Sequence, residues 1–132
     1  MNEPRGLHHI ELNVSNLERS SDFWGWLLSE LGYSVFQEWP KGKSWILGDT
    51  YIVLVQTEEK YLEGGYNRQR IGLNHVALHV ESRQKAESLT NAIRDRGLKI
   101  LYEEKHPFAG GDDHFATYFE DPDRIKIELV AP

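Results

Sequence analysis

Residues 7–14 read LHHIELNV, and residues 73–80 read LNHVALHV. The two stretches align so that His9 and His75 occupy the same position, half a chain length apart in a sequence of 132 residues. Polar and apolar residues alternate along both stretches, which is the period of a β-strand with one covered face. A repeat of this length predicts two copies of one supersecondary unit, each beginning with a strand that carries a histidine.

The same order of elements follows each of the two strands. Ser15 and Glu18 have the spacing of a capping box, and apolar residues at helical spacing then run up to Gly32. A second helix is expected over 82–96, with Gly97 as its stop. Strands are expected over 33–39, 44–47 and 51–56 in the first half, and over 98–104, 114–119 and 124–130 in the second.

Each half is therefore expected to be a βαβββ module, and the fold class is α+β. Module one is expected over about 6–56 and module two over about 72–131, with a polar linker over about 57–71. Each half is too small to support an independent core, so residues 1–132 are expected to form a single domain.

The amino-acid composition restricts the classes of function that the chain can have. The formal net charge of −6, without a block of like charges, disfavours a nucleic-acid surface. The chain has no cysteine, so any metal must be held by nitrogen and oxygen atoms. The first residues contain no apolar signal region and no stretch reaches the length of a membrane span, so a cytoplasmic protein is expected.

The strand period places several ionisable residues on one face. His9 shares a face with Glu11, His75 with His79, and Glu128 lies on the same kind of face of the last strand, while the opposite faces are apolar. A carboxylate inside a fold needs a partner, and two imidazoles with one carboxylate suit a divalent ion such as Mn, Fe, Ni, Zn or Co. We therefore expect a metal site, with identity of the metal left open.

The whole chain resembles the vicinal oxygen chelate superfamily, which includes glyoxalase I, extradiol dioxygenases, fosfomycin resistance proteins and bleomycin resistance proteins. The resemblance rests on LHHIELNV at 7–14, DFW at 22–24, His75, and YFEDPD at 118–123 running into IEL at 127–129. It implies that the two modules form an open eight-stranded cup. It also implies metal ligands on the first and last strands of each module, which fall on His9, His75 and Glu128. The position in module one that matches Glu128 is Val53, which cannot bind a metal.

The resemblance implies a divalent-metal-dependent enzyme acting on a small substrate with vicinal oxygens, as a lyase, isomerase, ring-opening transferase or dioxygenase. The alternative is a metal-free protein that sequesters a small molecule or drug, of the bleomycin resistance type. A homodimer is also implied. The candidate catalytic residues are Glu11, His79 and His114. Glu11 is either a general base, a residue that supports a metal ligand without binding the metal itself, or a charge at the rim of the site. His8 is expected to be structural, and aromatic residues such as Trp45 and Tyr51 are expected to line the cup.

Overall fold

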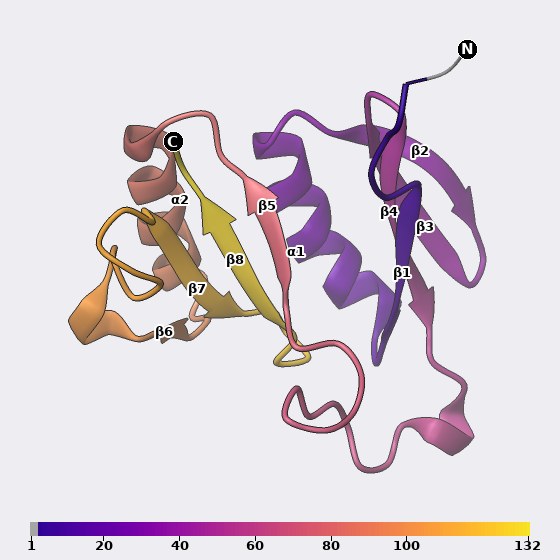
Figure 1. Ribbon diagram of the computed structural model, residues 1–132. Helices are drawn as coiled ribbons and strands as arrows, with labels where there is room; N and C mark the ends of the chain where they lie inside the picture. Colours follow the sequence, from indigo (N-terminus) through magenta and orange to yellow (C-terminus); the bar gives the residue numbers. More distant parts are fainter. Residues whose placement is uncertain (1–2) are drawn as a thin grey trace. The chain divides into compact units, whose positions relative to one another are not determined.

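The computed structural model describes residues 3–132. These form two compact units, one ending at Gly65 and the other beginning at Tyr66. Each unit contains one predicted module, and the boundary lies inside the predicted linker. The α+β class and the βαβββ order of both modules are confirmed (Figure 1). The single domain over 1–132 stays a prediction.

Module one contains a helix and a four-stranded sheet. Its strands run in the order β1-β4-β3-β2, with β1 parallel to β4 and the other pairs antiparallel. The elements are β1 (His9–Val14), α1 (Leu17–Glu30), β2 (Ser34–Trp39), β3 (Gly42–Leu47) and β4 (Thr50–Gln56), followed by the short 3₁₀ helix η1 (Glu59–Tyr61).

Module two repeats the topology. Its strands run in the order β5-β8-β7-β6, with β5 parallel to β8. The elements are β5 (Val76–His79), α2 (Arg83–Asp95), β6 (Ile100–Leu101), the 3₁₀ helix η2 (Glu103–Lys105), β7 (Ala116–Glu120) and β8 (Lys126–Val130).

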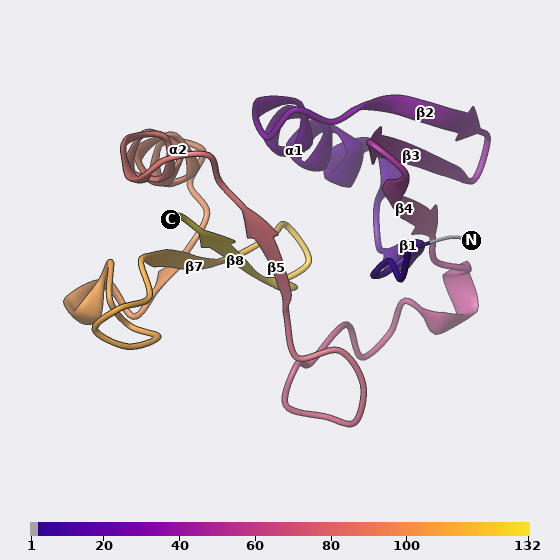
Figure 2. The same ribbon diagram turned by 45° about the horizontal axis from the view of Figure 1, so that its top comes forward.

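In each module the helix packs on one face of its own sheet, as Figure 2 shows for α1 and α2. Leu12 and Leu54 are buried on that face in module one, and Phe119 and Ile127 in module two. The other face of each sheet is therefore left for polar side chains, as the alternation of the sequence predicts.

Three local predictions were wrong. The N-cap of α1 is Asn16, whose side chain accepts a hydrogen bond from the Arg19 amide, and not Ser15. The strand expected over 98–104 ends at Leu101, because Tyr102 takes a left-handed backbone conformation (φ 57°) and η2 follows. Trp45 does not line a binding face, since its ring packs against Gly25 of α1 and is only 2% exposed.

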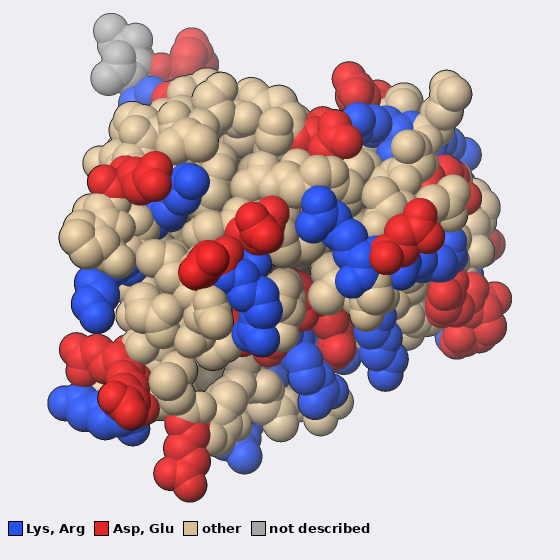
Figure 3. All heavy atoms as spheres, turned by 180° about the vertical axis from the view of Figure 1, so that it is seen from behind, with Lys and Arg blue, Asp and Glu red and all other residues tan. Residues whose placement is uncertain are grey.

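The terminators of both helices are confirmed, because Gly32 (φ 98°) and Gly97 (φ 81°) each take the left-handed conformation directly after the helix. No helix within residues 3–132 is long and apolar enough to cross a membrane. On the face drawn in Figure 3, acidic and basic side chains are interspersed.

Candidate metal centre

The strand register of module two brings three side chains into one row. Ala77 of β5 pairs with Glu128 of β8, which pairs with Tyr118 of β7. Residues that pair directly across neighbouring strands point to the same face of a sheet. Glu128 therefore stands in the middle of the sheet, on the face opposite α2.

Glu128 is a buried carboxylate, with its side chain 7% exposed. His75 Nε2 lies 3.0 Å from Glu128 Oε1, and His114 Nε2 donates to Oε2. Burial alone would raise the pKa of Glu128, but the hydrogen bonds from His114, His75 and Tyr118 outweigh it and hold the pKa below its usual value. The carboxylate is therefore held as an anion at the centre of a polar cluster.

Tyr118 completes the cluster from the neighbouring strand. Burial, together with the charge of Glu128, raises the pKa of Tyr118 to about 12. The phenol is therefore protonated at neutral pH and donates a hydrogen bond to Glu128.

The ring of His75 is oriented by the residue before it. His75 Nδ1 lies 2.6 Å from Asn74 Oδ1, an atom that can only accept a hydrogen bond. When Nδ1 donates to this oxygen, Nε2, the atom directed at Glu128, is left to bind a metal ion. This is the arrangement that ordinarily fixes a metal-binding imidazole.

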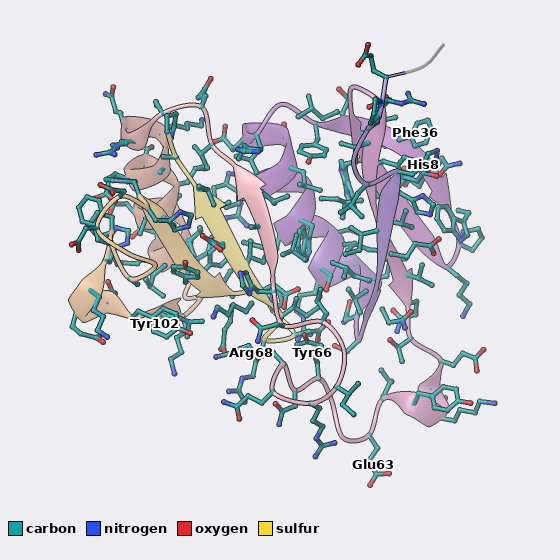
Figure 4. All side chains as sticks on the ribbon, in the orientation of Figure 1. His8, Phe36, Glu63, Tyr66, Arg68 and Tyr102 are labelled. Atoms are coloured by element: carbon teal, nitrogen blue, oxygen red, sulfur yellow. The ribbon has the colours of Figure 1, made fainter. Side chains whose placement is uncertain are left out.

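Module one has a similar but more open arrangement. His9 Nε2 lies 3.5 Å from Glu11 Oε2, and His9 Nδ1 lies 2.8 Å from His8 Nδ1. The His9 ring stacks on Tyr51 at 4.5 Å between ring centroids, and the rings of His8 and Phe36 also contact Tyr51 (Figure 4). His8 therefore contacts both His9 and Tyr51, which its predicted place on the alternate face of the strand did not indicate.

The donor set fits a divalent ion. Two donor atoms held about 2.1 Å from one ion at a right angle lie about 3 Å apart, which is the His75–Glu128 separation. Among residues 3–132, no group of three or more His, Asp and Glu side chains forms a complete metal-holding set. The third predicted ligand, His9, belongs to the other unit.

The remaining sequence-predicted residues differ in their surroundings. His114 contacts Glu128, as described, while the side chain of Glu11 is 57% exposed beside His9. His79 is exposed at the end of β5. Sequence reasoning gave no role to Asn74, and the only available signal was that it directly precedes a repeated histidine.

Comparison with known proteins identifies the family. The model of the Glyoxalase/Bleomycin resistance protein/Dioxygenase superfamily matches residues 6–129. The Bacillus subtilis (strain 168) protein YqjT is 53% identical over 126 residues, covering 96% of this chain and 98% of its own. Glutathione transferase FosA of Serratia marcescens is 29% identical over 125 residues, covering 95% of this chain and 79% of its own.

Solved structures of related proteins match this chain over nearly its whole length. The crystal structure of a candidate glyoxalase from Bacillus halodurans matches with a TM-score of 0.93 and 54% identity, over 96% of this chain and 95% of that chain. The fosfomycin resistance protein FosX from Listeria monocytogenes matches with a TM-score of 0.67 and 24% identity, over 98% of this chain and 95% of that chain, which shows the shared fold. The family match over nearly the whole chain means that this protein belongs to the glyoxalase/bleomycin resistance protein/dioxygenase superfamily.

Proposed function

We propose that the chain is a divalent-metal-dependent enzyme that acts on a small substrate with two neighbouring oxygen atoms. His9, His75 and Glu128 are the proposed ligands. The observation that carries the proposal is the buried Glu128 carboxylate, 3.0 Å from His75 Nε2, with the buried Val53 at the matching place in module one. Three ligands leave open positions for substrate oxygens.

When bound, the ion would supply Lewis-acid polarisation of the two substrate oxygens. Glu128 and His75 hold their donor atoms in place through Tyr118, His114 and Asn74. Glu11 is the proposed general base, because its exposed carboxylate is free of backbone hydrogen-bond donors in the described part of the chain. His114, whose side chain is 40% exposed, is a proposed proton donor. His79 is a second candidate for proton transfer, because it lies on the face of the module-two sheet that carries Glu128.

Group transfer to such a substrate is the favoured reaction class. The support is the FosA relative, a glutathione transferase that aligns with 95% of this chain. Lyase, isomerase and dioxygenase reactions are the other classes within the same proposal. A cytoplasmic location and a homodimer belong to the proposal as well.

Metal titration tests the ligand set. Calorimetric titration of metal-free protein with Zn²⁺ or Mn²⁺ is expected to show one ion per chain. Glu128→Gln and His75→Ala should each weaken metal binding by more than about 100-fold. This is a larger effect than is usual for changing a residue that only hydrogen-bonds to a metal ligand. The matched control is Glu87→Gln, which removes charge from another His–Glu contact of module two, that with His106 at 2.6 Å, and should leave affinity unchanged.

Two results would overturn the proposal. One is the absence of stoichiometric metal binding by the wild-type protein. The other is a Glu128→Gln variant that binds metal as tightly as Glu87→Gln. A panel of α-hydroxythiol, catechol and epoxide compounds, assayed with metal-loaded and chelated protein, then identifies the substrate. Metal-independent ligand binding that survives His75→Ala would favour the drug-sequestering alternative.

A further inference from the structure

Lys126 stands one step along β8 from Glu128, on the same face of the sheet. Alternate residues of a strand share a face and lie about 7 Å apart. The ammonium of Lys126 donates to the Tyr102 hydroxyl at 2.8 Å. It also lies 4.9 Å from the centroid of the Tyr102 ring and 5.1 Å from that of Tyr118. A cation is therefore held at the edge of the Glu128 cluster.

The carboxylate that the sheet places beside Lys126 is bound elsewhere. Glu120 of β7 pairs with Lys126 in the strand register. Its oxygens instead contact Arg68 Nη1 at 2.6 Å and Arg124 Nε at 3.5 Å. Glu128, the other acidic neighbour, is engaged by His75, His114 and Tyr118. Within residues 3–132, Lys126 thus has no carboxylate partner.

Two other lysines that lie over aromatic rings provide a contrast. Lys43 lies 5.6 Å from the Trp45 centroid and 3.8 Å from Glu38. Lys60 lies 5.1 Å from the Tyr61 centroid and 3.7 Å from Glu58. Aromatic rings attract a cation but do not neutralise it. Acidic residues outnumber basic ones in this chain, 21 to 15, so acidic partners for a lysine are plentiful. Lys126 is half-buried and has none among the described residues. An anion bound from outside the chain would explain this.

The backbone at Tyr102 supports the same interpretation. Its left-handed conformation (φ 57°, ψ 39°) is unfavourable for a residue with a bulky side chain. β6 ends directly before Tyr102, and the Tyr102 and Tyr118 rings lie with their centroids 5.4 Å apart. Unfavourable backbone conformations cluster at functional sites, and this one lies at the residue whose hydroxyl accepts a hydrogen bond from Lys126.

We infer that Lys126, framed by Tyr102 and Tyr118, binds an anionic group of the substrate, a phosphate, phosphonate or carboxylate. The two tyrosine rings lie beside the ammonium, and the Tyr102 hydroxyl, which accepts from Lys126, keeps its own hydrogen to donate to the anion. As a statement about the substrate this inference rests on the proposed function, since the anionic group would lie beside the oxygens directed at the metal ligands. Binding of a simple anion at Lys126 requires no metal.

The test uses inorganic phosphate as the probe and metal-free protein at low salt. Side-chain NMR signals of the lysines are followed during the titration. The Lys126 signal is expected to shift in a saturable manner at millimolar phosphate, while those of Lys43 and Lys60, which have acidic partners, move at least fivefold less. Because Lys126→Met has no Lys126 signal, phosphate binding by the variants is followed through the ring signals of Tyr102, which contacts Lys126. The saturable shift of these signals in the wild type should disappear in Lys126→Met and remain in Lys126→Arg. Lys43→Met is the matched control and should leave the Lys126 response intact.

A response of Lys126 no larger than that of Lys43 and Lys60, or a saturable response that survives in Lys126→Met, would overturn the inference. Zn²⁺ titration of the same samples distinguishes this failure from failure of the proposed function. Lys126→Met should bind the metal within about threefold of the wild-type affinity, because Lys126 is not a proposed ligand. Phosphate binding at Lys126 together with absent metal binding would retain the anion site and refute the metal-dependent enzyme.

Discussion

The two modules place one carboxylate at the same cross-strand pair, but on opposite strands. In module one the pair is Glu11 of β1 with Val53 of β4, and in module two it is Ala77 of β5 with Glu128 of β8. Both carboxylates face the Nε2 atom of the repeated histidine, at 3.5 Å in module one and 3.0 Å in module two. The repeat therefore preserves a His–carboxylate pair while exchanging which strand supplies the acid.

Burial separates the two pairs. The Glu11 side chain is 57% exposed, whereas that of Glu128 is 7% exposed. The residue on the third strand also differs between the modules. In module two, Tyr118 donates a hydrogen bond to Glu128. In module one the matching residue is Ser44, which pairs with Val53 and is hydrogen-bonded to Gln37 of β2. A buried, hydrogen-bonded carboxylate suits a ligand, and an exposed one suits proton transfer. The difference in burial therefore supports the different roles proposed for Glu11 and Glu128.

The largest expected effect comes from making module one resemble module two. Val53→Glu would bury a carboxylate without the partners that Glu128 has, and should lower the free energy of unfolding by about 3–5 kcal/mol without metal. Saturating Zn²⁺ should recover much of this loss, because a fourth ligand would then be neutralised. Thermal unfolding of metal-free and metal-loaded protein measures both, and Val53→Gln is the uncharged control. Equal stabilisation of Val53→Glu and Val53→Gln by Zn²⁺ would contradict the expected equivalence with Glu128.

A smaller effect is expected from the residues that orient the two histidines. Asn74→Leu removes the acceptor of His75 Nδ1 and should weaken Zn²⁺ binding about 10–100-fold. Asn74→Asp keeps an acceptor and should retain affinity. His8→Leu makes the same change in module one, with an effect of similar size on His9. Calorimetry checks all three, and an Asn74→Leu affinity equal to that of the wild type would show that His75 needs no such support.

The last effect, which ranges from about 1–3 kcal/mol down to none, concerns buried hydroxyl groups of the two helices. Trp24 fills the core at a point in α1 where α2 has Thr90, whose hydroxyl donates to the Ala86 carbonyl and contacts Thr117 Oγ1 at 2.7 Å. Thr90→Val leaves the buried Thr117 hydroxyl without that partner and should cost about 1–3 kcal/mol. Ser20 Oγ has no hydrogen-bond partner among the described residues, so Ser20→Ala should leave stability unchanged or raise it. Urea unfolding measures the free energy of unfolding of both variants. An equal loss of stability in Thr90→Val and Ser20→Ala would contradict the expected difference.

The sequence repeat was enough to predict both modules, since strand alternation and helix terminators are local signals. It also predicted that Val53 matches Glu128, and the registers of β4 and β8 agree. The contacts of Asn74, His8 and Lys126 could not be predicted, because they depend on ring orientation and on which partner Glu120 selects. The early end of β6 was missed because a left-handed tyrosine has no sequence signal. Assembly of His9 with His75 and Glu128 stays a prediction.

Anomalous diffraction from crystals of the Zn²⁺- or Mn²⁺-loaded protein tests that assembly most directly. We predict one anomalous peak per site, bonded to His9 Nε2, His75 Nε2 and a Glu128 oxygen, with the remaining positions open to water or substrate. A metal bonded through other side chains, or no peak beside Glu128 at saturating metal, would contradict it.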